Sequence, residues 1–119
     1  MLMVTSEKTD GIEVVSFTTD RINALNIDRI RPGILKLFET PFTKVVIDLA
    51  GVDYLDSTAF AMILHLLRVS HSNYCTIRLC GLTQSARELF KLLQLHKALD
   101  IYTDRESCLE SYRRNGPSY

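Results

Sequence analysis

The stretch from Val45 to Ala59, VVIDLAGVDYLDSTA, decides the fold class of this 119-residue chain. It overlaps a nearly continuous apolar run, Lys44 to Leu49, which is typical of a strand buried on both faces of a sheet. A loop from Ala50 to Leu55 follows, and Thr58 to about Ser72 then carries apolar residues at helical spacing. A buried strand followed directly by an apolar helix predicts an α/β domain in which this helix packs on a sheet.

Strand and helix patterns alternate on both sides of this stretch. Asp10-Gly11 is a strong hairpin signal between two strand-like runs, and Thr18 to Asn26 is a polar loop. The predicted strands are 3–7, 12–17, 44–49, 75–80 and 100–103, and the predicted helices are 27–39, 58–72, 85–95 and about 103–112. This order predicts a mixed β-sheet of about five strands with about four helices mainly on one face. We assign residues 1–114 to this single domain and 115–119 to a flexible C-terminal tail.

Three local patterns predict how individual helices begin and which faces they bury. Pro32-Gly33 predicts a kink or a late start in the helix 27–39. Ser85 with Glu88 fits a capping box, and Thr83 is a rival N-cap. In the helix 58–72, the apolar stripe is predicted to include Phe60, Ile63, Leu64 and Leu67, while the solvent stripe keeps Ala61, His65, Arg68 and Ser72.

The composition fits a globular domain and excludes several function classes. The chain has 14 Lys and Arg against 14 Asp and Glu, so its formal net charge is zero. It therefore has no basic face for nucleic acid or anionic lipid beyond Arg113-Arg114. The longest uncharged run near the centre, Ser57 to Leu67, is too short to span a bilayer, and the N-terminus lacks a secretory signal. We predict a cytoplasmic protein that neither binds nucleic acid nor inserts into a membrane.

The cysteines predict no disulfide and no metal site. Cys75 and Cys80 flank one strand-like run and point to opposite faces of a regular strand, so they cannot easily form a bond. Cys108 lies alone in the sequence. Without a Cys-x-x-Cys pair or a metal-ligand spacing, three reduced structural thiols are expected, with no metal and no cofactor.

No catalytic centre is visible in the sequence. Asp53 and Asp56 are paired carboxylates, but no third group with a clear role accompanies them. The spacing of His65, His71 and His96 suits neither a catalytic triad nor a zinc site. The five glycines are isolated, so no phosphate-binding loop is present. We therefore expect a protein that is not an enzyme.

The polar residues at the start of the helix 58–72 have two alternative roles, capping of the helix and phosphorylation. Asp56, Ser57 and Thr58 are all suited to cap a helix, because their side-chain oxygens accept hydrogen bonds from free backbone N–H groups. If Asp56 is the cap, Ser57 occupies the first helical position and is easier to modify. A phosphate on that hydroxyl would meet the positive end of the helix dipole. Capping alone is the more common role, and the residues by themselves leave both open.

The stretch from Val45 to Ala59 resembles the signature of STAS domains, and looks most like that of bacterial anti-sigma factor antagonists. That signature is an apolar strand, Asp-Leu-Ser-Gly-Val and then Asp-Ser-Ser/Thr-Gly. The likeness continues through residues 80–83, 89–92, 95 and 101–102, and it covers most of the chain from Gly11 onward. It implies a STAS-like fold and a role in regulating transcription.

In anti-sigma factor antagonists, the serine directly after this Asp is phosphorylated by the cognate anti-sigma factor serine kinase. The resemblance therefore implies that Ser57 is a phosphorylation site, with a phosphatase as a further partner. Unphosphorylated, the protein would bind the kinase and so release a sigma factor; phosphorylated, it would be rejected. The partner-binding residues implied are Asn23, Asp53, Asp56, Ser57, Thr58, His65 and Arg68.

Two residues depart from the family pattern. Ala59 stands where the family usually has Gly, and Asn23 stands where it often has Asp. Neither change removes the Ser57 hydroxyl. The same resemblance allows an alternative function, a STAS adaptor subunit of a membrane lipid or anion transporter that docks permanently and is not phosphorylated. In that case Ser57 is a structural cap or a contact.

Overall fold

Five strands form one mixed sheet in the spatial order β1-β2-β4-β6-β7. The computed structural model describes residues 3–115 of the chain. The strands of this sheet are β1 (Val4–Thr9), β2 (Ile12–Phe17), β4 (Lys44–Asp48), β6 (Thr76–Cys80) and β7 (Asp100–Tyr102). β1 pairs antiparallel with β2 through the Asp10-Gly11 turn, and all later neighbours pair in parallel. The predicted mixed five-stranded sheet is confirmed.

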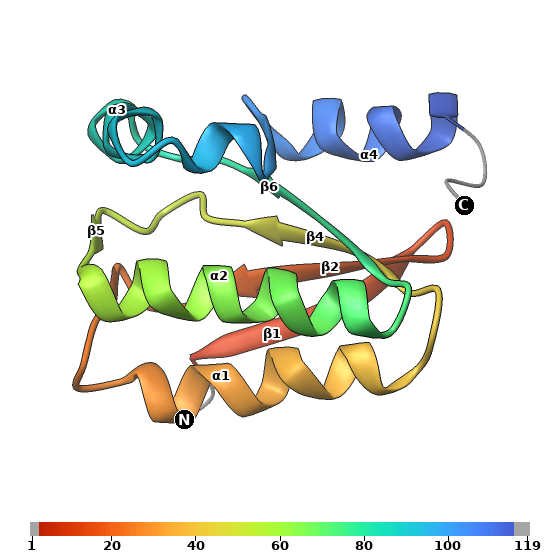
Figure 1. The fold of residues 1–119 in the computed structure, drawn as a ribbon, viewed down its shortest axis with the longest axis horizontal. Helices are drawn as coiled ribbons and strands as arrows, with labels where there is room; N and C mark the ends of the chain where they lie inside the picture. Colours follow the sequence, from red (N-terminus) through yellow and green to blue (C-terminus); the bar gives the residue numbers. More distant parts are fainter. Residues whose placement is uncertain (1–2, 116–119) are drawn as a thin grey trace.

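Helices cover the two faces of this sheet unequally (Figure 1). The helical elements are α1 (Ile27–Leu35), η1 (Lys36–Glu39), α2 (Ser57–Ser72), α3 (Gln84–Leu92), η2 (Leu95–Lys97) and α4 (Arg105–Asn115). In Figure 1, α1 and α2 run side by side below the sheet, and α4 lies above it. Phe90 of α3 belongs to the same core cluster as the buried residues of α1 and α2, and the predicted fold class of four helices on a mixed five-stranded sheet is confirmed.

Alternation along the strands divides the core into two clusters. Val45 and Ile47 of β4 belong to the larger cluster, with the buried side chains of α1 and α2 and with Phe90 of α3. Val46, between them, belongs to the smaller cluster with Cys108, Leu109 and Tyr112 of α4. Successive residues of a strand point to opposite faces, so a continuous apolar strand serves both helix layers.

Two short strands lie in segments predicted to be loops. β3 (Arg21–Ile22) falls within 18–26 and β5 (Tyr54–Leu55) within 50–55, and the two pair in parallel as a separate ribbon. A strand of two residues is too short to show a period, so only tertiary pairing reveals it. These two segments are therefore corrected from loop to loop with a short strand.

The helix starts also differ from the sequence patterns. α1 begins at Ile27, so the late start is wrong; Pro32 lies inside α1, and the chain continues as a 3₁₀ helix from Lys36. Thr83 caps α3 by accepting from the Ala86 N–H at 3.2 Å, whereas Ser85 lies inside the helix. Asp104 accepts from the Ser107 N–H at 2.8 Å at the start of α4.

The C-terminal boundary stays a prediction. α4 ends at Asn115, the first residue of the predicted tail, and residues 116–119 lie outside the described part of the chain.

The three thiols are buried and free, as predicted. Cys75 and Cys80 lie in the two different core clusters, on opposite faces of the sheet. Cys108, alone in the sequence, is a neighbour of Cys80 in the fold. A hydrogen bond with Cys108, together with burial, raises the pKa of the Cys80 thiol.

Candidate functional site

The carboxylate of Asp56 caps α2 and anchors the neighbouring loop. Its Oδ1 accepts hydrogen bonds from the backbone N–H groups of Thr58 at 3.0 Å and Ala59 at 3.1 Å, and from the Thr58 hydroxyl. Its Oδ2 accepts from the N–H of Ala24 at 3.0 Å. These bonds, above all the one from the Thr58 hydroxyl, lower the pKa of Asp56 because they stabilise the ionised form. Asp56 is therefore the N-cap among the three candidates.

The loop before α1 is held against the start of α2 by its own backbone. The N–H groups of Asp53 and Tyr54 donate to the carbonyl of Asp20, and the β3–β5 pairing continues this contact. Within the loop, the Asn26 side chain accepts from the N–H of Asn23 at 3.0 Å and donates to a carbonyl. Segments about 30 residues apart in the sequence thus form one surface.

Ser57 occupies the first helical position of α2, and its side chain is exposed. Because Asp56 is the cap, capping does not require the Ser57 hydroxyl. Its Oγ makes no hydrogen bond to any residue that the structure describes. A phosphate at this position would meet the positive end of the helix dipole, beside the Asp56 cap that accepts from the N–H groups of Thr58 and Ala59.

The exposed face of α2 continues from Ser57 toward the C-terminus of the helix. Ala61, His65 and Arg68 are exposed and follow Ser57 at helical spacing, as the sequence predicts. Leu64, predicted to belong to the apolar stripe, is 37% exposed and lies at the edge of this face. His65 and Arg68 therefore lie on the same face as Ser57 but two and three turns away.

The structure brings five of the seven candidate partner-binding residues together at the start of α2. Asn23, Asp53, Asp56, Ser57 and Thr58 share this surface through the contacts described above. In Figure 1 it occupies the end of the molecule where β5 and the start of α2 meet. Whether these residues contact a partner stays a prediction.

Two large side chains on this surface were missed by the sequence reading. Leu25 is 88% exposed and Tyr54 is 50% exposed, and the Arg21 guanidinium lies over the Tyr54 ring at 5.9 Å from its centroid. Tyrosine is enriched at protein interfaces, and the exposed leucine beside it adds apolar area that a partner can bury. The sequence did contain a signal for these two contacts. Leu25 and Tyr54 are large side chains in predicted loops that follow predicted strands.

The Asp48 carboxylate, at the end of β4, supports the loop that follows this strand. Its carboxylate accepts from the N–H of Ala50 at 3.0 Å and from Nε of Arg105 at 2.8 Å. Arg105 also donates to Ser16 and pairs with Glu7. The pair joins α4 to β4.

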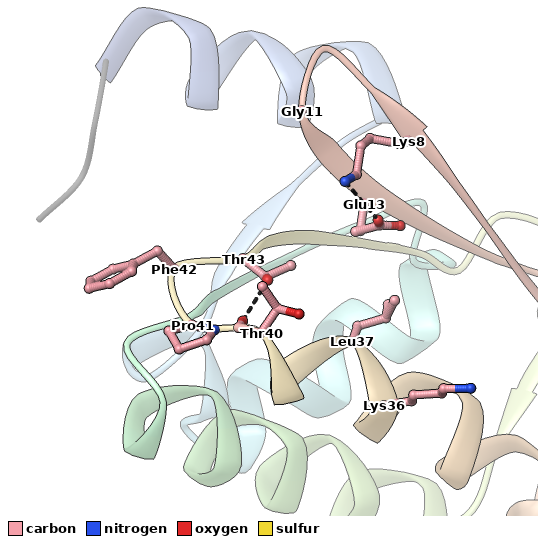
Figure 2. A pocket seen from close by; sticks show the side chains of 9 residues that line it. All are labelled: Lys8, Gly11, Glu13, Lys36, Leu37, Thr40, Pro41, Phe42 and Thr43. Atoms are coloured by element: carbon pink, nitrogen blue, oxygen red, sulfur yellow. Dashed lines mark hydrogen bonds and ion pairs between the residues drawn. The ribbon is translucent and has the colours of Figure 1, made fainter.

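No metal centre is found in the described part of the chain. Among residues 3–115, no group of three or more His, Cys, Asp or Glu side chains could hold a metal ion. The hollow in Figure 2, about 470 Å³, lies at the amino end of β4. There, Lys8 pairs with Glu13 at 3.7 Å and the Thr43 hydroxyl donates to the Thr40 carbonyl, so these groups satisfy each other.

Comparison with protein families decides what this architecture is. The family model described as STAS domain matches residues 3–108. The chain belongs to the STAS domain family. A comparison with curated proteins found none that matches this sequence. Among the described helices of this STAS domain, none has the length and apolar character needed to cross a membrane.

Solved structures show the same fold in proteins of two kinds. An anti-sigma factor antagonist STAS protein from Planctomyces limnophilus superposes with a TM-score of 0.84 at 17% identity, over 91% of this chain and 96% of that one. The anti-sigma factor antagonist SpoIIAA, in its unphosphorylated form, gives 0.74 at 16% identity, over 92% and 96%. The murine anion transporter Slc26a9 gives 0.69 at 12% identity, over 87% of this chain but 18% of the transporter.

Proposed function

We propose that this STAS domain is a bacterial anti-sigma factor antagonist that regulates transcription by binding an anti-sigma serine kinase, and that phosphorylation of Ser57 switches it off. The observation that carries the proposal is the exposed Ser57 hydroxyl, which the Asp56 cap leaves available at the first position of α2. Two structural neighbours of nearly the same length are anti-sigma factor antagonists. The protein acts by binding and is not itself an enzyme.

The proposed switch changes the charge of a surface and leaves the fold intact. A phosphate adds about 1.5–2 negative charges at neutral pH. The helix start tolerates this charge, whereas the carboxylates of Asp53 and Asp56 beside it make the surface strongly negative. The exposed Leu25 and Tyr54 give the unphosphorylated surface its apolar contacts. A kinase seated on this surface then rejects the product, because burying like charges opposes association. A phosphatase that removes the phosphate restores binding.

The modification is tested by incubating the protein with candidate anti-sigma serine kinases of its source organism, Mg²⁺ and ATP. Mass spectrometry should find one phosphate, on Ser57. Ser57→Ala should remove it, and Ser72→Ala, a control at the exposed far end of α2, should keep it. Phosphate confined to other residues would contradict the proposal.

Binding is tested with the same kinase by titration. Ser57→Ala should bind like the wild type, while Ser57→Asp should bind about tenfold more weakly or worse. Ser72→Asp, at the exposed far end of α2, adds the same charge away from the site and should have little effect. The Ser57→Asp variant should also keep the wild-type circular dichroism spectrum. Equal affinities for Ser57→Ala and Ser57→Asp would argue against a charge switch.

A second candidate is a permanent adaptor subunit of a membrane lipid or anion transporter. The observation in its favour is the structural match to 18% of the chain of the anion transporter Slc26a9. In that case the Ser57 surface docks on a transporter component and is not phosphorylated. Affinity purification of the tagged chain from its source organism separates the two, since the first function predicts a kinase and the second a transporter subunit.

A further inference from the structure

Helix α3 and its C-cap residue together expose three leucines that the core does not use. Leu92 is 77% exposed, Leu93 is 51% exposed and Leu89 is 37% exposed. On the same helix, Phe90 alone is fully buried. The exposed leucines stand at positions i, i+3 and i+4, the spacing with which one helix packs against another. We call Leu89, Leu92 and Leu93 the leucine ridge.

The leucine ridge lies on a helix that adjoins the Ser57 surface. The ring of Phe90 packs on Phe60 of α2, with ring centroids 4.9 Å apart. Phe60 stands three residues after Ser57, within one helical turn. α2 follows β4 and α3 follows β6, so both helices begin at the carboxyl ends of neighbouring parallel strands. In Figure 1, α3 lies at the same end of the molecule as the start of α2.

Cationic side chains line the flank of α3. Arg87 and Lys91 line two adjoining hollows, one of about 380 Å³ with Gln84 and Glu88, the other of about 180 Å³ with His96. Between Gln84 and Lys97 there are three Lys and Arg side chains and a single carboxylate, although the whole chain is neutral. A partner that covers this helix is therefore expected to bring acidic groups.

The charge and the size of this surface distinguish among three occupants. A second copy on a two-fold axis would place the same basic flank against itself, which repels. Two leucines on a nine-residue helix and a third at its C-cap give little area for a lipid surface. An amphipathic helix with an apolar face and acidic flanks satisfies both the leucines and the hollows beside them.

We propose that the leucine ridge, with Arg87 and Lys91, is a second docking surface that binds an acidic amphipathic helix of the partner protein. The inference rests on the proposed function for the identity of that partner, the anti-sigma serine kinase. The ridge lies on a different helix from Ser57, so it holds the kinase without sensing the phosphate directly. The phosphorylation state of Ser57 then determines whether the contact at α2 contributes to binding in addition to the ridge.

The test is a titration of the kinase with Leu92→Gln/Leu93→Gln, which removes apolar contact, adds no charge and keeps residues that favour a helix. Affinity should fall about tenfold or more, since buried anchors dominate interface energies. Arg87→Glu/Lys91→Glu should weaken binding as well, more at low than at high salt. The matched control, Ser6→Ala/Ser107→Ala, changes exposed polar residues outside α3 and should bind like the wild type.

The outcomes separate this inference from the proposed function. If the wild type binds, Ser57→Asp weakens binding and the leucine variant binds like the wild type, the second docking surface is wrong and the switch stands. If the wild type binds no kinase, the proposed function fails and takes the inference with it. Cosedimentation of the wild type with phosphatidylglycerol vesicles, lost in the leucine variant, would assign the ridge to lipid and overturn the inference. Concentration-dependent dimerisation lost in that variant would overturn it in favour of a second copy.

Discussion

The Asp56 carboxylate joins two segments that meet at the candidate site. It accepts from the N–H groups of Thr58 and Ala59 in α2 and from the N–H of Ala24 in the loop before α1. Removing this carboxylate therefore disturbs both the helix start and the loop beside Ser57. The position can be predicted as a cap from the sequence, but its bond to Ala24 cannot, because 32 residues separate the two.

Replacement of Asp56 by Asn keeps a good N-cap but removes the charge at the helix start and one of the two acceptor oxygens, so it should lower the melting temperature at neutral pH by about 2 °C. The pKa of Asp56 is lowered in the folded state from an unfolded value near 3.8. Its stabilising effect is therefore complete above that value and is lost as the pH falls through the lower, folded pKa. Thermal unfolding of the wild type and Asp56→Asn from pH 7 to pH 2 should show a constant difference down to about pH 4, and then convergence. A difference that grows below pH 4 would contradict this.

Gly81 is required by the close approach of the loop after β4. Its φ is +76°, and a Cβ there would lie 2.6 Å from the Ala50 nitrogen and 2.7 Å from Asp48 Oδ1. Gly81→Ala should cost about 2–4 kcal/mol in free energy of unfolding, from backbone strain and collision together. Gly51 has a similar φ of +87° but open space around it, so Gly51→Ala is the control and should cost about 1 kcal/mol. Equal losses in urea unfolding would contradict the collision.

At the scale of elements, Arg105 fastens α4 to three strands of the sheet. Its guanidinium contacts Asp48 of β4, Ser16 of β2 and Glu7 of β1. Asp48 is the buried member of this group, with 8% of its side chain exposed. The position of Arg105 in the first turn of α4 gives no hint of these contacts, since its partners lie 57 to 98 residues away.

Arg105→Ala should destabilise the fold by about 2 kcal/mol, because it leaves the Asp48 carboxylate buried without its ion pair. Arg113, also on α4, pairs with the exposed Asp10 and Glu106, and Arg113→Ala should change stability little. The double variant Arg105→Ala/Asp48→Asn should recover part of the loss. Urea unfolding of the four proteins measures all three effects, and equal losses for the two single arginine variants would contradict the role of Arg105.

At the scale of the whole molecule, the two core clusters depend on one another through the sheet. Cys75 belongs to the cluster under α1 and α2, while Cys80 and Cys108 belong to the cluster under α4. All three thiols are buried and free. Their reactivity therefore reports the opening of both faces of the sheet.

A thiol reagent such as Ellman's reagent should label none of the three cysteines rapidly in the native protein, and all three in urea. The hydrogen bond to Cys108 and burial raise the pKa of Cys80, which lowers its thiolate fraction further. If folding is cooperative, the three should become reactive at one rate across the two clusters. Fast labelling of Cys108 alone would show that α4 opens separately.

The sequence by itself determined the fold class and the position of Ser57. Periodicity is local, so the apolar run 44–49 and the helix after it were identifiable, and five strands and four helices followed. The N-cap residues could be predicted only in part. Asp56, Thr83 and Asp104 each have a neighbouring residue with a hydroxyl group that could cap the helix as well. Only tertiary structure decides which oxygen faces the free N–H groups.

Tertiary structure also decided everything that depends on distant neighbours. The β3–β5 ribbon, the Ala24–Asp56 bond, the Asp48–Arg105 pair and the proximity of Cys80 to Cys108 join segments with no shared periodicity. The exposure of Leu64 and of the leucine ridge likewise depends on which elements pack nearby. The identity of an apolar residue does not show whether another element covers it. The sequence places the Ser57 hydroxyl at a helix start. The tertiary structure makes Asp56 the cap, so the hydroxyl stays exposed on a surface that two loops form.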